Sequence, residues 1–558
     1  MDYNILIGGS AGQGMETLSS ILETVLKRKG FEIFTIRDYM SRVRGGHNFI
    51  QTRFANKKLT SHKRELNVII ALNEETISLH EERLSNDGIV LCDESLEYEG
   101  DRLIKLPLKT TAKNIGNLKV FGSVALGALL KLFGNDLSHT QGVLKDIFKP
   151  DAALYNITAM EEGFKLIDSK FNIGTPEPDK NILINGNDSI ALGAIAAGCK
   201  FYSAYPMTPS TSIMNYLASK IEEAKIVVEQ AEDEIAGINM AIGASYAGVR
   251  AMTGTSGGGF ALKVEALGLS GMMEVPLVVA EIQRPGPTTG FPTRTEQGDL
   301  KFVISSSPGE FPRMVIALRN PQDCFYQTIR AFNLADKYRI PVVLLGDQFL
   351  ADTTVTVEPF DFDKVEVNRY LNDEEYTDGK EFKPYELTDT GISPRIVPGR
   401  IKGTRVLADS DEHDEYGRIT ESADIRIKMT DKRLNKMKLL SQEVLEPYYY
   451  GEDDCDVLLV GWGSLDGPIK DALTMLNKNE EKKYGALVFG DIWPLPTKIL
   501  MEKAKNVKTV INVEQNATGQ LASIIMEVTG IRCSNSVLKY DGRPISGEEI
   551  FERLEEAK

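Results

Sequence analysis

The sequence lacks clustered cysteines, long apolar runs and an excess of basic charge. Its five cysteines lie far apart, at Cys92, Cys199, Cys324, Cys455 and Cys533. The CxxC spacing that is typical of iron–sulfur or zinc ligation is absent, so no metal ligands are expected in this chain. No stretch approaches the roughly 20 uninterrupted apolar residues of a membrane helix, and the N-terminus lacks the basic segment of a signal peptide. These absences predict a cytoplasmic protein outside the membrane, with reduced and mostly buried thiols.

The charge balance excludes a further class of protein. The net charge of −16 argues against nucleic-acid binding, which relies on Lys and Arg to neutralise phosphates. Hydrophobic residues make up 42% of the chain and charged residues 26%, as in ordinary globular proteins. A chain of 558 residues is too long for one core, and about one domain per 150 residues predicts three or four.

Strand-like and helical patterns alternate along most of the chain, which predicts a multi-domain α/β fold. A strand at 4–7 followed by a helix at 15–28 favours a parallel sheet in the first part. A stretch dense in charged residues later in the chain is interpreted as an extended connection. The expected organisation is a domain at 1–170, a linker at 171–180, a domain at 181–355, the connection at 356–449 and a domain at 450–558.

A glycine-rich turn, Gly9-Ser-Ala-Gly12-Gln-Gly14, lies between the first strand and the first helix. Its backbone amides could hold a phosphate at the helix N-terminus. Dinucleotide binding would need an acidic ribose partner about 20 residues on, and Asp38 lies at only a loose distance. A tight turn or a phosphate-bearing acyl carrier is therefore preferred. Arg42 and Arg44 add two cations before His47, where a solvated loop is the alternative.

The segment Tyr205-Pro-Met-Thr-Pro-Ser-Thr211 follows a run expected to be a buried strand. Its two prolines, three positions apart, exclude a helix and fix the backbone. Thr208 is thereby presented at the C-terminal end of the strand, where α/β sheets bind ligands. The alternative is a stiff turn that begins a helix expected at 211–223.

Acidic residues from Glu229 to Glu234 precede a helix rich in Ala and Gly, expected at 238–247. A carboxylate at a helix start gains from the dipole, so capping is the alternative for each acid taken singly. The small residues of this helix allow a ligand or another chain to approach closely. The next turn, Thr253-Gly-Thr255-Ser-Gly-Gly-Gly, is lined by hydroxyls, and a plain flexible loop explains it equally well.

The loop at 281–297 is rich in Gly, Pro and Thr and carries Arg284 and Arg294. Such a loop packs poorly, whereas a guanidinium can bind a carboxylate bidentately. We expect it to bind a substrate carboxylate, with a surface loop as the alternative.

These motifs together resemble the alpha subunit of 2-oxoacid:ferredoxin oxidoreductases, in the form with a gamma domain fused at its N-terminus. GGSAGQG and SRVRGGH are similar to the gamma domain at 1–170, and 181–355 resembles a pyrimidine-binding domain. VGWGS, PLP and VEQNATGQL at 450–558 resemble a transketolase C-terminal-like domain. The connection, with ELTDTGISPRIVPG and SDEHDEYGRITE, is also similar to that of the family.

The resemblance implies a cofactor, thiamine diphosphate, and a catalytic acid. Glu234 matches the glutamate that hydrogen-bonds the aminopyrimidine ring and promotes its imino tautomer, which then removes the thiazolium proton. Tyr205 and Pro206 match residues beside this cofactor.

The resemblance also implies a substrate pocket. Thr208 resembles the threonine near the reacting carbon, and Arg284 resembles the arginine that pairs with the 2-oxoacid carboxylate. Thr293 is similar to a threonine of the same pocket. Met207 departs from the family, which commonly has Ile there, but this swap nearly conserves volume.

Finally, the resemblance implies a beta subunit, as an alpha–beta heterodimer or its dimer. The Gly-Asp-Gly motif that usually holds the magnesium ion of thiamine diphosphate is absent here, and in the family the beta subunit supplies it together with an iron–sulfur cluster. Ferredoxin or flavodoxin would accept the electrons and coenzyme A the acyl group. The gamma-type domain would cover or bind coenzyme A, through Gly12, Gly14 and Arg44.

The expected activity is the coenzyme A-dependent oxidative decarboxylation of a 2-oxoacid. We favour 2-oxoglutarate, for whose second carboxylate Arg294 is available unless it has a surface role. Pyruvate and branched-chain 2-oxoacids are the alternatives. Two other classes stay open: a non-catalytic scaffold subunit, and a nicotinamide-dependent dehydrogenase that uses the glycine-rich turn.

Overall fold

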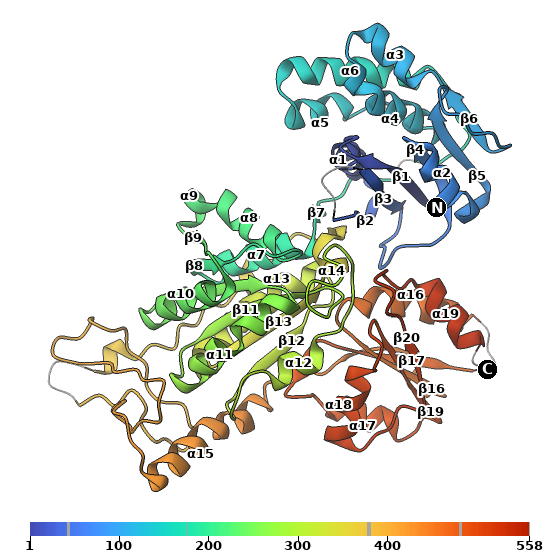
Figure 1. Ribbon diagram of the computed structural model, residues 1–558. Coiled ribbons are helices and arrows are strands. Elements are labelled where there is room, and N and C mark those ends of the chain that lie inside the picture. The colour runs from blue at the N-terminus through green and yellow to red at the C-terminus, as the bar shows by residue number, and fades with distance from the viewer. Residues whose placement is uncertain (42–44, 175, 377–380, 479–481, 557–558) are drawn as a thin grey trace. The chain divides into compact units, whose positions relative to one another are not determined.

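The computed structural model describes residues 1–41, 45–174, 176–376, 381–478 and 482–556, which form two compact units (Figure 1). Unit 1 is Met1–Ile184 with Thr353–Pro359, and unit 2 is Asn185–Asp352 with Phe360–Lys558. Within the described ranges, no helix combines the length and the apolar character that a membrane crossing requires.

Unit 1 is built on an eight-stranded sheet with the order β6-β5-β4-β1-β3-β2-β14-β7. Its strands are β1 (Asp2–Ala11), β2 (Glu32–Asp38), β3 (Gly45–Ala55), β4 (Leu66–Ala71), β5 (Leu84–Asp93), β6 (Leu103–Leu106), β7 (Ile182–Ile184) and β14 (Thr354–Val357). Its helices are α1 (Met15–Arg28), α2 (Glu74–His80), α3 (Leu108–Ile115), α4 (Phe121–Leu132), α5 (Thr140–Ile147) and α6 (Pro150–Phe164).

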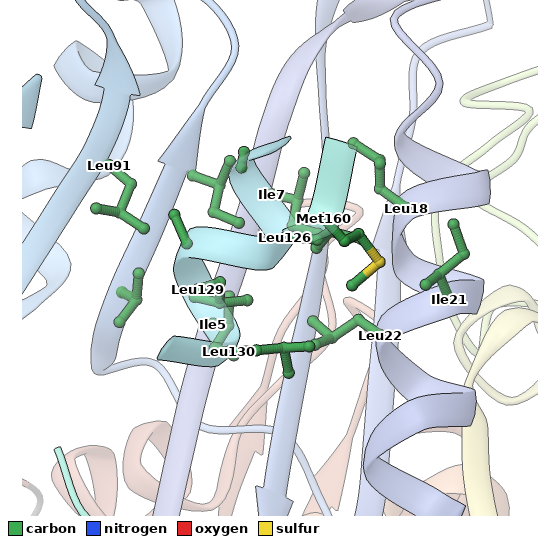
Figure 2. Close-up of a cluster of buried hydrophobic side chains, with 14 of the residues drawn as sticks. Ile5, Ile7, Leu18, Ile21, Leu22, Leu91, Leu126, Leu129, Leu130 and Met160 are labelled. Carbon is green, nitrogen blue, oxygen red and sulfur yellow. The ribbon is translucent and has the colours of Figure 1, made fainter. Parts of the chain in front are cut away.

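The core of unit 1 follows from the two-residue period of β1. Ile5 and Ile7 join one buried cluster and Leu6 joins another, because successive strand residues point to opposite faces. Figure 2 shows side chains of the first cluster, which come from β1, β5, α1, α4 and α6. Helices α4 and α6 pack with their backbones close together: a Cβ on Gly127 would lie 2.1 Å from the carbonyl oxygen of Met160. Glycine at this crossing permits the approach.

The expectation of a parallel sheet in this part is wrong for β3, which runs antiparallel to both β1 and β2. Strand β3 was not anticipated because several of its buried residues are polar. Gln51 and Arg53 are buried, and they are satisfied by hydrogen bonds to the carbonyl of Lys63 and to the carboxylate of Asp2. The hydrophobic pattern therefore does not predict this strand, because its buried polar residues are satisfied by partners inside the protein.

The second sheet lies in unit 2 and has the order β18-β12-β13-β11-β10-β8-β9, with parallel pairing throughout except between β12 and β18. Its strands are β8 (Cys199–Ala204), β9 (Val227–Gln230), β10 (Arg250–Thr255), β11 (Leu277–Gln283), β12 (Met314–Ala317), β13 (Pro341–Asp347) and β18 (Asp491–Trp493). The helices of this part are α7 (Gly186–Ala196), α8 (Thr211–Ser219), α9 (Ile221–Ala224), α10 (Glu234–Tyr246), α11 (Gly257–Met272), α12 (Leu300–Ser305), α13 (Pro321–Tyr338) and α14 (Gln348–Asp352).

The third sheet, also in unit 2, has the order β15-β17-β16-β19-β20. Its strands are β15 (Tyr448–Gly451), β16 (Val457–Trp462), β17 (Tyr484–Phe489), β19 (Thr509–Glu514) and β20 (Asn535–Leu538). The remaining helices are α15 (Ala423–Leu440), α16 (Asp466–Leu476), α17 (Lys498–Ala504), α18 (Gln520–Thr529) and α19 (Gly547–Glu556).

The continuous apolar runs of the second sheet were interpreted correctly, since every residue of β11 and β13 is buried. The helix expected at 211–223 is instead divided into α8 and α9, with Lys220 at the break. The helix expected at 238–247 begins earlier, so that Glu234 falls in the first turn of α10. This earlier start places the Glu234 carboxylate at the N-terminus of α10.

Candidate active site

Three loops meet at the carboxyl ends of parallel strands in unit 2. The segment after β8 carries Thr208, the turn after β10 leads into α11, and the loop after β11 carries Arg284. Strands β8, β10 and β11 are neighbours in the sheet, so these loops share one edge. This is the edge at which α/β sheets bind ligands.

Glu234 begins α10 and is only 5% exposed. The preceding residue, Asp233, caps the helix by accepting a hydrogen bond from the amide of Ala236 at 2.8 Å. Asp233 therefore caps the helix, and capping does not explain why Glu234 is buried at its start. Among the described residues, the Glu234 carboxylate accepts no hydrogen bond and forms no ion pair. A buried carboxylate without partners is costly, which makes this side chain a candidate for contact with a ligand.

The glycines that begin α11 leave room for this carboxylate. A Cβ on Gly259 would lie 2.8 Å from Oε1 of Glu234 and 2.2 Å from Oγ1 of Thr255. The turn after β10, for which a flexible loop was the alternative, is therefore a close-packed wall of the site. The hydroxyl of Ser256 in this turn is fully buried and has no hydrogen-bond partner among the described residues.

Arg284 and Thr208 are brought together directly. The guanidinium of Arg284 donates a hydrogen bond from Nη1 to the carbonyl oxygen of Thr208 at 2.7 Å, while its buried Nε has no hydrogen-bond partner among the described residues. Thr255 reaches the same loop, because its hydroxyl lies 3.9 Å from the sulfur of Met207. Contacts through Thr255 thus link the loop that carries Thr208 to the wall beside Glu234.

Two carboxyl groups near Arg284 were not anticipated. Glu281 is fully buried, and neither of its oxygens has a hydrogen-bond partner among the described residues. Burial raises the pKa of Glu281 well above its ordinary value, and the nearby Asp299 raises it further. Burial also raises the pKa of Asp299 to about 6. The sequence offered no signal for them, because Glu and Asp are ordinarily exposed residues.

Lys263 is the third unanticipated residue. It lies on α11, its side chain is fully buried, and its ammonium donates hydrogen bonds to the carbonyl oxygen of Glu234 at 3.0 Å and to the hydroxyl of Thr253 at 3.1 Å. The sequence shows it only as a lysine within an otherwise apolar helix.

The other residues expected in the site differ in how exposed they are. Tyr205 is 41% exposed, and Pro206 is half-buried. Thr293 and Arg294 are both buried, at 8% and 9% exposure, so a surface role for Arg294 is wrong. The expected contact of Thr293 with the substrate stays a prediction.

The glycine-rich turn of unit 1 lines a pocket of its own. Gly12 and Gly14 have φ angles of 91° and 80°, and a Cβ on either would meet no atom of the described residues within 4 Å. Within the described part of the chain no side chain caps the start of α1, and the first backbone amides of a helix can bind an anion. The pocket has a volume of about 380 Å³ and is also lined by Asp38 and Tyr39. Arg42 and Arg44 lie outside the described residues.

Comparison with known protein families gives three matches that together span most of the chain. Residues 192–432 match the family described as pyruvate flavodoxin/ferredoxin oxidoreductase, thiamine diP-bdg. Residues 4–166 match pyruvate ferredoxin/flavodoxin oxidoreductase, and residues 455–550 match pyruvate:ferredoxin oxidoreductase core domain II.

Individual proteins match over nearly the full length. The 2-oxoacid:ferredoxin oxidoreductase subunit alpha of Sulfolobus sp is 30% identical over 99% of this chain and 96% of its own. The 2-oxoglutarate oxidoreductase subunit KorA of Mycobacterium tuberculosis is 28% identical over 93% of this chain and 86% of its own. A solved structure of the 2-oxoglutarate:ferredoxin oxidoreductase from Magnetococcus marinus, with 2-oxoglutarate, coenzyme A and succinyl-CoA bound, is 32% identical. It covers 100% of this chain and 99% of its own, with a TM-score of 0.93.

Proposed function

The chain belongs to the family of 2-oxoacid:ferredoxin oxidoreductase alpha subunits, and from this premise we propose that it carries the catalytic glutamate, Glu234, of a thiamine diphosphate-dependent enzyme. The reaction would be 2-oxoacid, coenzyme A and oxidised ferredoxin giving acyl-coenzyme A, carbon dioxide and reduced ferredoxin. The single observation that carries the proposal is the Glu234 carboxylate, buried yet without a hydrogen-bond partner among the described residues.

The residues around Glu234 fit the pyrimidine half of thiamine diphosphate. A flat ring with a ring nitrogen and an amino group needs a carboxylate in a dry environment and a wall without side chains. Glu234 offers the first, and Gly257 to Gly259 at the start of α11 offer the second. When bound, the cofactor supplies a carbon nucleophile and a place for the electrons left after carbon dioxide departs.

The chain's own residues would move one proton and orient the substrate. Glu234 would hold a proton at a carboxylate oxygen, within a site that excludes water. Arg284 would bind the carboxylate of the 2-oxoacid with the donors that do not bond Thr208, and its Nε, which has no partner in the described part of the chain, supports this. The bond from Nη1 to Thr208 holds the guanidinium beside the loop that we expect to line the reacting carbon.

A beta subunit would complete the site. Large apolar side chains are exposed on α10, α11 and the loop after β11, namely Ile235 (51%), Met240 (42%), Leu262 (52%) and Phe291 (57%). Apolar exposure on neighbouring elements is typical of a protein interface. We propose that the partner covers this surface and holds the diphosphate, its magnesium ion and an iron–sulfur cluster that passes electrons to ferredoxin or flavodoxin. The assembly would be an alpha–beta heterodimer or its dimer.

Coenzyme A would bind to unit 1. The pocket beside Gly12 and Gly14 suits a phosphate group, because it lies at the start of α1, which no described side chain caps. Because Asp38 also lines this pocket, a dinucleotide is the rival ligand, and titration with NADH and coenzyme A would separate the two. We propose that residues 1–170 form the gamma-type domain, 181–355 the pyrimidine-binding domain and 450–558 the transketolase C-terminal-like domain.

We propose 2-oxoglutarate as the substrate, ahead of pyruvate and branched-chain 2-oxoacids. The Magnetococcus marinus structure, which matches over the full chain, has 2-oxoglutarate bound. In this chain Arg294 is a buried cation on the same loop as Arg284, as a second carboxylate would require.

The test is a steady-state assay of this chain purified with its beta partner, across these three classes of 2-oxoacid, with coenzyme A and ferredoxin. The proposal expects acyl-coenzyme A to form, with the highest kcat/KM for 2-oxoglutarate. Absence of product from every 2-oxoacid would reject the enzymatic proposal. A Glu234→Gln variant with full turnover would instead favour a scaffold subunit, in which the partner alone does the chemistry.

A further inference from the structure

Lys263 has a position that packing alone does not explain. Its side chain is fully buried on α11, and its ammonium reaches across to the first turn of α10. There it donates to the carbonyl oxygen of Glu234 at 3.0 Å, and it also donates to the hydroxyl of Thr253 at 3.1 Å. A hydrophobic residue would pack between these helices without the cost of burying a charge.

The ammonium of Lys263 has no ion-pair partner among the described residues, although Glu234 and Asp233 are near enough to attract it. Burial lowers the pKa of Lys263 to about 8, against the attraction of these two carboxylates. Asp233 is the N-cap of α10 and Glu234 is its first residue. An ammonium has three donors, and bonds to described residues use two of them here.

The contact fixes the residue that the proposed mechanism depends on. Asp233 caps α10 from one side through the amide of Ala236, and Lys263 ties the carbonyl of Glu234 from the other. With its backbone held on both sides, Glu234 keeps its side chain against Gly259.

We propose that Lys263 is a positioning residue for Glu234: it holds the first turn of α10 in place, and its positive charge balances the carboxylate while Glu234 exchanges a proton. This inference rests on the proposed role of Glu234. It adds a second residue to the proton-handling part of the site, one that does not contact the substrate.

The proposal has a signature in the pH profile. As pH rises through about 8, Lys263 loses its proton and the positive charge beside Glu234 disappears. Turnover should therefore fall on the alkaline side, in kcat more than in KM, because Lys263 does not contact the 2-oxoacid. If Lys263 served packing alone, kcat should not decline on the alkaline side of the pH profile.

The experiment compares Lys263→Met, Lys263→Gln and Lys263→Arg, each in the full chain with its beta partner. We expect Lys263→Met to lower kcat by about ten- to a hundredfold, the usual weight of a hydrogen bond to a charged group, with little change in the KM for 2-oxoglutarate. Lys263→Gln keeps a donor but no charge, so it should show reduced kcat and no alkaline limb. Lys263→Arg keeps the charge and should restore part of kcat, with the limb moved to higher pH.

A second readout does not depend on activity. In hydrogen–deuterium exchange of the full chain, the amides of residues 235–238 should exchange about tenfold faster in Lys263→Met than in the wild type. Lys436→Met is the matched control, because Lys436 is also fully buried but bonds Glu274 instead. It should leave exchange at 235–238 unchanged.

The outcomes separate the two proposals. If the wild-type complex forms no acyl-coenzyme A while Lys263→Met still accelerates exchange at 235–238, the proposed function fails and the positioning of α10 stands. Unchanged kcat, pH profile and exchange in Lys263→Met would overturn the proposal for Lys263. Should Lys263→Met fail to fold, Lys263→Gln decides: a wild-type alkaline limb in that variant would equally overturn it.

Discussion

Two buried glutamates of unit 2, at opposite ends of α11, differ in how they are satisfied. Glu274 follows the C-terminus of α11 and is bonded by the ammonium groups of Lys432 and Lys436 from α15. These cations hold the pKa of Glu274 well below its ordinary range, against the effect of its burial. Glu234 faces the N-terminus of the same helix, and its carboxylate accepts no bond from any described residue.

The nearby cations show the same difference. Arg339, beside Glu274, spends Nε on the carbonyl of Glu274 and Nη1 on that of Pro384. Arg284, in the loop after β11, keeps a buried Nε to which no described residue is hydrogen-bonded. A satisfied cluster ties segments of the chain together, whereas an unsatisfied one retains binding capacity for a ligand.

Replacing Glu234 is the most direct test of the contrast between Glu234 and Glu274. Glu234→Gln keeps the size and burial of the side chain but removes the proton acceptor. We expect turnover to fall by about 10²–10⁴-fold, the usual range for a general acid or base, with an unchanged melting temperature. Steady-state kinetics of the complex and thermal unfolding of the chain measure the two effects. A loss of stability that matches the loss of turnover would mean that Glu234 is structural.

The reverse result is expected for Glu274. Glu274→Gln leaves Lys432 and Lys436 without their common counter-charge, and breaking a buried ion pair costs about 3–5 kcal/mol. Chemical denaturation should show this loss, while the folded protein keeps its turnover at low temperature. Unchanged stability would show that the lysines shed their protons at little cost, and the contrast with Glu234 would disappear.

A smaller effect should distinguish the two arginines. Arg284→Lys loses the planar donors that hold Thr208 and await a carboxylate, worth about 1.5–3 kcal/mol. The KM for the 2-oxoacid should rise about ten- to a hundredfold, with little change in stability. Arg339→Lys is the matched control, and it should lower stability without changing KM. Equal KM values for wild type and Arg284→Lys would remove Arg284 from the substrate site.

The smallest effect concerns the helix that carries Glu234. A Cβ on Gly243 of α10 would meet no described atom within 4 Å outside the neighbouring turns of its own helix, so Gly243→Ala should stabilise the isolated chain by about 0.5–1 kcal/mol. Denaturant unfolding of the chain alone measures this. A destabilisation would show that α10 is under strain at this position and that Glu234 is held less simply than described.

Sequence patterns anticipated much of this arrangement. The apolar runs that form β11 and β13 and the prolines around Thr208 were sufficient to expect a site at the carboxyl ends of parallel strands. Family resemblance then selected Glu234 and Arg284, and the structure brings Arg284 into contact with Thr208.

The rest was hidden because it depends on contacts between residues distant in sequence. Lys432 and Glu274 are 158 positions apart, and nothing local marks either as buried. Lys263 and Glu281 are charged residues in apolar surroundings, where composition alone favours exposure. Their burial follows from the packing of α11 and β11 within unit 2, which no local pattern records.

The most direct test is a structure of this chain with its beta partner and thiamine diphosphate. The account predicts an oxygen of Glu234 within hydrogen-bond distance of the pyrimidine ring, about 2.6–3.2 Å, with the diphosphate held by the other chain. A Glu234 carboxylate turned away from the ring, or a cofactor bound entirely by this chain, would contradict it.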